Sequence, residues 1–144
     1  MEEITLKFTK RIDYLHMVTS LARETCATIG DIKIDSNFKN AVELCVNEAC
    51  VNAIKHSGDT YTSRTVNISF CIFDDRLVIN LKEQGPGYDI DNVPIPEIEK
   101  HPECGYGIYL IKAMMDKVEY ERENNWNILS MTKYFHPGNE EQGT

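Results

Sequence analysis

Two pairs of extended segments, each joined by a short polar turn, constrain the fold of this chain more than any other feature. Residues 66–73 and 77–81 are rich in β-branched and aromatic side chains, with Asp74 and Asp75 between them. Residues 118–123 and 128–135 repeat the pattern around Asn124 and Asn125. Short turns join antiparallel neighbours, so we expect two hairpins in one sheet.

Helical patterns lie outside the hairpins and are separated from them along the chain. The elements expected there are a strand over residues 4–9 and helices over residues 12–29, from a cap at Asp35 or Ser36 to about Ser57, and over residues 107–115. Because helices and hairpins are segregated, the order predicts an α+β fold. We expect a two-layer sandwich in which helices cover one face of a mixed, mostly antiparallel sheet.

Composition narrows the class of protein. The 144 residues suit one domain, expected over residues 1–135 with a polar tail over 136–144. A net charge of −8 argues against binding to a nucleic-acid backbone. No apolar run of about 18 residues is present, and the acidic N-terminus lacks a signal-peptide pattern. The five cysteines form no CxxC pair, so we expect reduced core thiols in a cytoplasmic protein without membrane contact.

A stretch rich in proline and glycine separates the hairpins. Residues 84–104 hold two glycines and four prolines, which predicts a loop of about twenty residues. Loops of that length in compact domains are usually functional lids or disordered segments. We therefore expect either a lid or a disordered segment here.

The second predicted helix carries polar side chains within its apolar stripe. Glu48 and Asn52 lie one turn apart in the sector of Ala49, and Lys55 and His56 follow on the next turn. One interpretation is a pair of buried hydrogen bonds to a neighbouring strand or loop. The other is a polar site that supplies a general base and an oxygen ligand for Mg²⁺.

Two glycine clusters favour the second interpretation. Residues 83–87 follow a predicted strand, and Gly105-Tyr106-Gly107 opens a predicted helix. Glycine lets a backbone approach a ligand closely, and a helix N-terminus presents free N–H groups to an anion. The pattern is neither a Walker A loop nor a dinucleotide-binding fingerprint. Together the clusters predict a nucleotide phosphate site.

These motifs resemble a known superfamily. Residues 43–56 resemble the N-box of the GHKL ATPases, residues 83–87 the first glycine box and residues 105–111 the second. The chain is most similar to the small bacterial anti-sigma factor serine kinases. The resemblance implies a GHKL-type fold, ATP and Mg²⁺ as cofactors, and a lid over residues 89–104.

The resemblance also assigns roles to single residues. Glu48 stands at the position of the general base, and Asn52 at that of the Mg²⁺ ligand. Lys55 and His56 would lie near the phosphates. The remaining positions are Gly85 and Gly87 in the adenine-side loop, Gly105 and Gly107 at the lid hinge and phosphate-binding helix, and Glu83 and Tyr106 within the two boxes.

By resemblance, the function is that of an ATP-binding anti-sigma regulator. It would sequester a sigma factor and phosphorylate a serine on a STAS-type anti-anti-sigma partner. Family members commonly form homodimers, and residues 4–8 are a candidate edge strand.

Two positions depart from the family pattern: Glu83 replaces the usual Asp that accepts the adenine amino group, and Tyr106 replaces a small or basic residue. The Glu83 replacement moves the carboxylate by about 1.5 Å. The alternatives are therefore a nucleotide-binding partner-switching module without efficient kinase activity, and a relative that shares only the fold.

Overall fold

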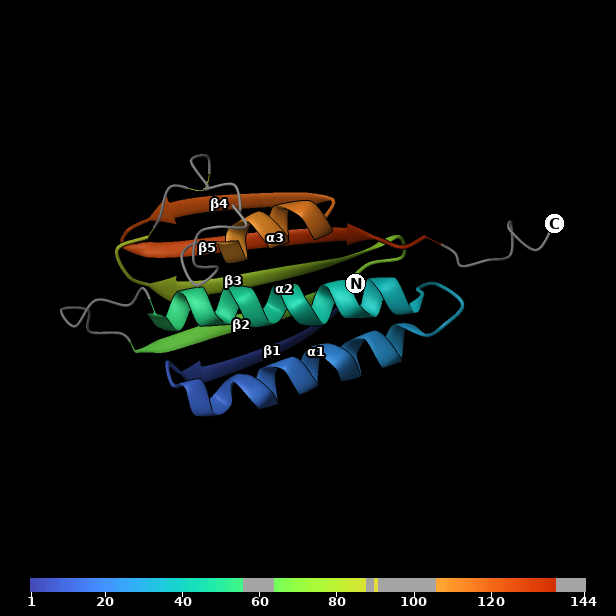
Figure 1. The fold of residues 1–144 in the computed structure, drawn as a ribbon, viewed down its shortest axis with the longest axis horizontal. Helices are drawn as coiled ribbons and strands as arrows, with labels where there is room; N and C mark the ends of the chain where they lie inside the picture. Colours follow the sequence, from blue (N-terminus) through green and yellow to red (C-terminus); the bar gives the residue numbers. More distant parts are fainter. Residues whose placement is uncertain (56–63, 88–89, 91–105, 137–144) are drawn as a thin grey trace, which may run out of the picture.

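The computed structural model describes residues 1–55, 64–87, 90 and 106–136. Its sheet has the strand order β1-β2-β3-β5-β4, and the helices lie on one face (Figure 1). The described elements are β1 (Glu2–Thr9), a 3₁₀ turn (Ile12–Tyr14), α1 (Leu15–Ile29), α2 (Ser36–Lys55), β2 (Thr65–Ile72), β3 (Arg76–Gln84), α3 (Tyr106–Met114), β4 (Lys117–Glu123) and β5 (Trp126–Tyr134). The predicted α+β two-layer fold is confirmed.

Every pairing between these strands is antiparallel, so no parallel pair of the expected mixed sheet occurs in the described residues. The register places Glu83 of β3 between Val66 of β2 and Asn127 of β5. Strand β3 therefore runs past Leu81, where the sequence pattern predicted its end, and Glu83 lies inside the strand. Pairing with β2 on one side and β5 on the other keeps Lys82 and Glu83 in the sheet. The residue pattern of a single strand does not reveal such pairing.

Local signals fix the ends of several elements. Asp35 caps α2, because its Oδ1 atom accepts the backbone N–H of Phe38 at 2.8 Å. Asn124 and Asn125 have φ angles of 53° and 70°, which suit the two-residue turn between β4 and β5. Both features confirm the predicted helix start and hairpin. The predicted end of the helix near Ser57 lies outside the described residues.

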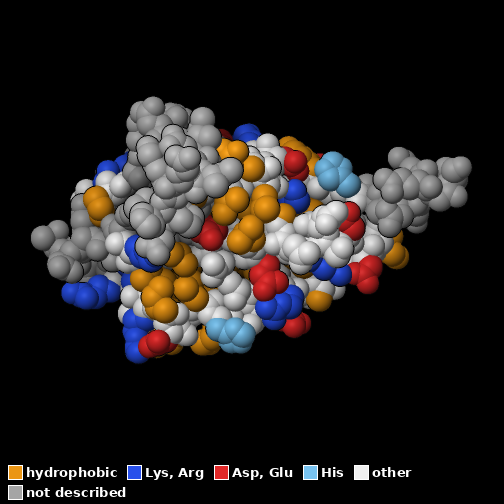
Figure 2. All heavy atoms as spheres, viewed as in Figure 1, with side chains coloured by type: hydrophobic (Ala, Val, Ile, Leu, Met, Phe, Trp, Pro, Cys, Tyr) orange, Lys and Arg blue, Asp and Glu red, His pale blue; other side chains and the backbone are white. Residues whose placement is uncertain are grey.

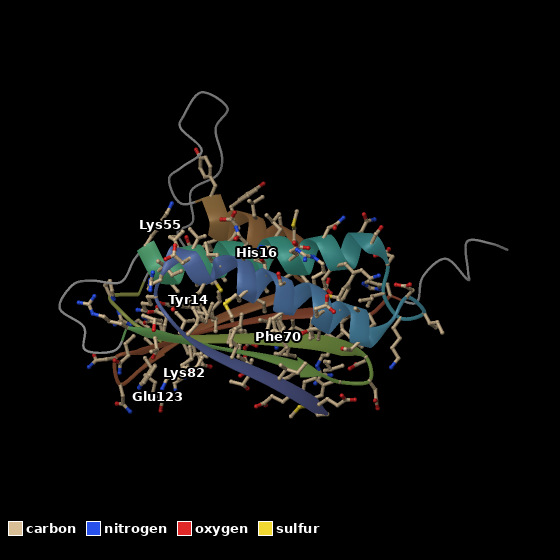
Figure 3. The ribbon with its side chains drawn as sticks, turned by 90° about the horizontal axis from the view of Figure 1, so that it is seen from below. Tyr14, His16, Lys55, Phe70, Lys82 and Glu123 are labelled. Atoms are coloured by element: carbon tan, nitrogen blue, oxygen red, sulfur yellow. The ribbon has the colours of Figure 1, made fainter. Side chains whose placement is uncertain are left out.

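The core fills the layer between helices and sheet. Phe70 of β2 is fully buried there, whereas Lys82 and Glu123 lie on the opposite face of the sheet (Figure 3). Four cysteines are buried and free, namely Cys26, Cys45, Cys50 and Cys71. Burial raises the pKa of Cys45 and of Cys50 to about 12, so these thiols stay protonated. Cys26, Cys45 and Cys50 pack as core side chains, as predicted for most of the cysteines. Cys71 instead donates its thiol to Glu3 Oε2 at 3.6 Å, and Cys104 lies outside the described residues.

On the helical face, hydrophobic, acidic and basic side chains are interspersed (Figure 2). The helices of the described residues include none long and apolar enough to cross a membrane.

Candidate functional site

The C-terminal half of α2 carries the predicted polar pair. Glu48 and Asn52 are half-buried, next to the buried Ala49 and Ala53. Within the described part of the chain, no hydrogen bond to the Glu48 carboxylate or the Asn52 amide is found. The interpretation in which both are used up in structural hydrogen bonds is therefore not supported there.

The first turn of α3 lies directly against this pair. A Cβ atom added to Gly107 would come within 2.7 Å of Glu48 Oε2 and 3.3 Å of Asn52 Nδ2. Only glycine fits at this distance without a shift of the Glu48 side chain. The contact brings the start of a helix, where backbone N–H groups have no intrahelical partner, onto a carboxylate and an amide. Free N–H groups at the start of a helix bind anions, and an amide oxygen is a ligand for Mg²⁺.

A second group of polar side chains surrounds Glu83. Its Oε2 atom accepts a hydrogen bond from Lys10 Nζ at 2.8 Å, and the two side chains are only 9% and 4% exposed. Its Oε1 atom accepts a hydrogen bond from Asn127 Nδ2 at 3.0 Å. Lys10 Nζ also donates to the carbonyl of Gln84. Both carboxylate oxygens of Glu83 therefore already have partners within the protein.

The loop after β3 is fixed by side chains of the β4–β5 hairpin. The Gly85 carbonyl accepts hydrogen bonds from Asn127 Nδ2 at 3.2 Å and from Arg122 Nη2 at 3.3 Å. Arg122 also donates to the carbonyl of Pro86. Gly87 has a φ angle of +74°, and a Cβ there would lie 2.8 Å from Tyr120 Oη. The first glycine cluster is therefore a tight loop in which Gly87 has neither space nor a conformation for a side chain.

A cavity of about 10 Å³ lies between α2 and the sheet beside this loop. We call it the β3–β5 cavity; it is lined by Ala49, Ala53, Leu81, Glu83, Tyr120, Asn127 and Leu129. Its volume is that of about one water molecule. A purine therefore enters only after side chains that line the cavity move apart. One of these side chains, Tyr120, belongs to β4, which is an edge strand of the sheet.

The two groups of residues meet along α2. Ala49 and Ala53 line the cavity, and each directly follows one of the polar residues that contact Gly107. Of the predicted site residues, this arrangement brings together Glu48, Asn52, Glu83, Gly85, Gly87 and Gly107. Tyr106 is half-buried in the first turn of α3, and Lys55 is exposed at the end of α2 (Figure 3). His56, Gly105 and the lid, apart from Ile90, lie outside the described residues.

The sequence patterns missed Lys10, Asn127, Arg122 and Tyr120. One signal existed for Asn127, because it occupies an inward position of a strand whose next inward residues are Leu129 and Met131. A polar residue in such a series is a candidate for a site. Lys10 follows the first strand and carries no comparable local signal, since its partner is 73 positions away.

The donor set fits one Mg²⁺ ion held together with phosphates. Mg²⁺ is usually bound by one or two protein oxygens plus substrate phosphates. Asn52 offers one amide oxygen, and the described residues contain no cluster of three or more His, Cys, Asp or Glu for a metal held by protein alone.

Comparison with known proteins agrees with this geometry. Residues 8–133 match the family of histidine kinase-like ATPase domains. The chain belongs to this family, and the predicted family membership is confirmed.

Among the similar proteins is the serine-protein kinase RsbW of Bacillus velezensis. It is 30% identical over 111 residues, which cover 72% of this chain and 69% of that protein. RsbW of Bacillus subtilis is 30% identical over 101 residues, which cover 65% of this chain and 62% of that protein. The chain thus spans about two thirds of the length of these serine-protein kinases.

Two solved structures share the fold. One holds the RsbU and RsbW domains of a Mycobacterium tuberculosis protein, with a TM-score of 0.70, 14% identity, and coverage of 95% of this chain and 34% of that chain. The other is the SiaB–SiaC complex of Pseudomonas aeruginosa, with a TM-score of 0.61, 8% identity, and coverage of 91% of this chain and 89% of that chain.

Proposed function

We propose that the chain is an ATP-dependent serine kinase that also acts as an anti-sigma factor. In this function it sequesters a sigma factor and phosphorylates a serine on a STAS-type anti-anti-sigma partner. The observation that carries the proposal is the contact of Gly107 with Glu48 and Asn52, which joins the start of α3 to a carboxylate and an amide. The similarity to serine-protein kinases named RsbW supports the choice of serine.

In the proposed reaction, Asn52, the start of α3 and the end of the N-box each have a separate role. Asn52 Oδ1 would hold Mg²⁺ against the phosphates, and the metal supplies positive charge that lowers the repulsion of an incoming nucleophile. The backbone N–H groups at the start of α3 would bind phosphate oxygens. Lys55, three residues beyond Asn52, would add positive charge near the same phosphates, and by the family resemblance His56 would also lie near them.

Glu48 would act as the general base. It accepts the proton of the serine hydroxyl while the serine oxygen forms a bond to the γ-phosphorus. The bond from that phosphorus to the bridging oxygen breaks, and ADP leaves with the electron pair. Phosphoryl transfer depends mostly on positioning and charge stabilisation, so this small set of groups suffices.

Phosphorylation gives the partner a mechanism of release. The new phosphate carries about −1.5 to −2 charge at neutral pH, and this chain has a net charge of −8. Repulsion between them would weaken the complex, because like charges across an interface oppose binding. The freed kinase then binds the sigma factor.

Calorimetric titration with Mg²⁺-ATP tests nucleotide binding. Transfer of radiolabelled γ-phosphate to the STAS-domain proteins of the same genome tests the kinase activity. Saturable binding and a serine phosphoester on one of these proteins are expected. The absence of saturable binding up to millimolar ATP would refute the proposal.

One observation favours a second candidate function. Both oxygens of the Glu83 carboxylate have protein partners, and the β3–β5 cavity has the volume of about one water molecule. A partner-switching module that binds nucleotide without efficient transfer fits these facts. It predicts ATP binding without a serine phosphoester on any STAS-domain protein.

A further inference from the structure

We propose that Arg122 of β4 is a positioning residue for nucleotide binding. Its guanidinium group holds the loop of residues 85–87, which follows β3, in the conformation that a bound nucleotide meets. The inference rests on the proposed nucleotide-binding function and adds to it a side chain that acts through the backbone of this loop.

The guanidinium group of Arg122 bridges two consecutive backbone carbonyls. Its Nη2 atom donates to the Gly85 carbonyl at 3.3 Å, and its Nη1 atom donates to the Pro86 carbonyl. A planar guanidinium group presents its N–H donors in a fixed fork, so it constrains both carbonyls at once. The relative orientation of these two peptide groups is therefore set by one side chain.

The sequence of the loop leaves its conformation to such outside contacts. Glycine populates a wide range of backbone conformations, and Gly85 and Gly87 flank Pro86, which has no backbone N–H to donate. Gly87 has a φ angle of +74°, in the left-handed region. Arg122 supplies two hydrogen bonds to the loop, and Asn127 Nδ2 supplies another to the Gly85 carbonyl at 3.2 Å.

Arg122 also packs along Gly87. A Cβ atom added to Gly87 would lie 3.0 Å from Arg122 Cδ and 3.0 Å from Arg122 Nη1. The same side chain therefore acts on all three residues of the loop, through hydrogen bonds at residues 85 and 86 and through packing at residue 87.

The loop lies within the candidate site. Tyr120 and Asn127 both line the β3–β5 cavity, and α2 supplies another of its walls. Both residues also touch the loop, because Asn127 donates to the Gly85 carbonyl and the Tyr120 hydroxyl would lie 2.8 Å from a Cβ atom at Gly87. A displaced loop therefore changes the surroundings of the cavity, and misplaced site groups lose affinity and rate steeply.

The exposure of Arg122 separates its effect on binding from an effect on stability. Arg122 is exposed on an edge strand, and substitutions at exposed positions usually change the free energy of unfolding little. A residue that merely stabilised the fold would change the thermal melt and leave the ATP affinity of the folded protein unchanged. The two roles therefore predict different measurements.

Calorimetric titration of Mg²⁺-ATP into the full chain tests the inference in Arg122→Met. Methionine keeps an unbranched stem and removes both hydrogen bonds. The affinity for ATP should fall at least about fivefold, the scale of one such hydrogen bond. The melting temperature of the ligand-free protein should stay within about 3 °C of wild type. An unchanged or tighter affinity would overturn the role of Arg122, and so would a loss of affinity accompanied by a larger fall in melting temperature.

Arg122→Lys distinguishes positioning from charge. Lysine keeps a positive charge near the anionic nucleotide, but its single ammonium group does not reproduce the fork that bridges two carbonyls. The affinity for ATP should therefore also fall, by at least about threefold. Wild-type affinity in this variant would show that charge alone matters and would overturn the positioning role.

Arg76→Met is the matched control. Arg76 lies at the start of β3, at the opposite end of that strand from the loop, and its Nη1 atom pairs with Asp75 at 2.9 Å. The substitution removes a positive charge from the same sheet, and the affinity for ATP should stay within about twofold of wild type. Equal losses in Arg76→Met and Arg122→Met would indicate a general effect of charge and overturn the inference.

The outcomes separate the two proposals. Wild-type affinity for ATP in Arg122→Met refutes this inference alone and leaves the nucleotide site in place. Failure of the wild type to bind Mg²⁺-ATP refutes the proposed function and this inference with it.

Discussion

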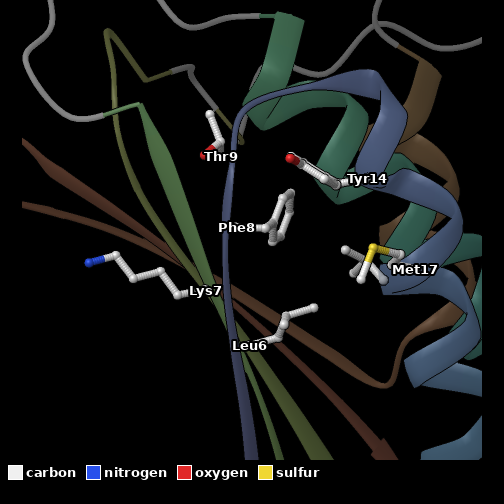
Figure 4. A pocket seen from close by; sticks show the side chains of 7 residues that line it. Leu6, Lys7, Phe8, Thr9, Tyr14 and Met17 are labelled. Atoms are coloured by element: carbon white, nitrogen blue, oxygen red, sulfur yellow. The ribbon is translucent and has the colours of Figure 1, made fainter.

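Two pockets in the described structure differ in volume and in chemistry, and the smaller one has the features of a ligand-binding site. The larger, which we call the β1–α1 pocket, has a volume of about 240 Å³. It is lined by Leu6, Lys7, Phe8, Thr9, Tyr14, Met17 and Val18. Leu6 and Phe8 face Tyr14 and Met17 across it, while Lys7 points away (Figure 4).

The β3–β5 cavity has a volume of only about 10 Å³. Its lining nevertheless includes Glu83, which forms a buried ion pair with Lys10, and Asn127, whose Oδ1 atom has no hydrogen-bond partner among the described residues. Ligand sites are marked by a few converging polar groups on apolar walls. The β1–α1 pocket has the apolar walls but few such groups. Buried polar groups, and not volume, therefore mark the proposed site.

The largest expected effect concerns Glu48, beside the β3–β5 cavity. Glu48→Gln keeps the shape and removes the basicity, so the rate of serine phosphorylation should fall about 10²–10⁴-fold. ATP affinity and partner binding should be close to wild type. Single-turnover transfer of labelled phosphate measures the rate. Glu43→Gln, on the same helix but paired with Arg23 at the surface, is the control and should keep the full rate.

Lys10→Met should produce the next largest effect, on stability. It leaves the Glu83 carboxylate buried without its counter-charge, which costs about 3–5 kcal/mol in the free energy of unfolding. Denaturant titration measures this loss. Arg23→Met breaks an exposed ion pair and should leave the stability almost unchanged. Equal losses in both variants would contradict the importance given to the buried pair.

Two glycine variants separate binding from stability. Gly107→Ala should weaken Mg²⁺-ATP binding about tenfold or more, since the new Cβ displaces Glu48 and Asn52 and misplaced site groups lose affinity and rate steeply. Gly30→Ala should instead lower stability by about 1–3 kcal/mol. Gly30 has a φ angle of +94° with no atom within 4 Å of an added Cβ, so ATP affinity should not change. Calorimetry and thermal melting measure the two effects.

The smallest effect is expected in the β1–α1 pocket. Met17 is 58% exposed, and Met17→Ser should change the free energy of unfolding by no more than about 0.5 kcal/mol. ATP affinity should stay within twofold of wild type. A large loss of ATP affinity in this variant would reverse the comparison and give the larger pocket a role in nucleotide binding.

Features encoded within a few neighbouring residues were predictable. The Asp35 cap, the turn at Asn124 and Asn125, and the polar pair Glu48 and Asn52 all follow from spacing along one element. Helical periodicity and left-handed turn preferences act over at most four residues, so they are visible in one sequence. The motif resemblance added the family, which the comparison confirmed over residues 8–133.

The surroundings of Glu83 were decided only by the tertiary structure. Lys10 is 73 positions away and Asn127 is 44 positions away, and the register of β3 against β5 brings Asn127 opposite Glu83. A shift of one residue would turn Asn127 to the other face of the sheet. The sequence alone determined that a carboxylate stands where the family has one. The long-range pairing of strands decided that this carboxylate is neutralised by Lys10, and that the unpaired acceptor beside it belongs to Asn127.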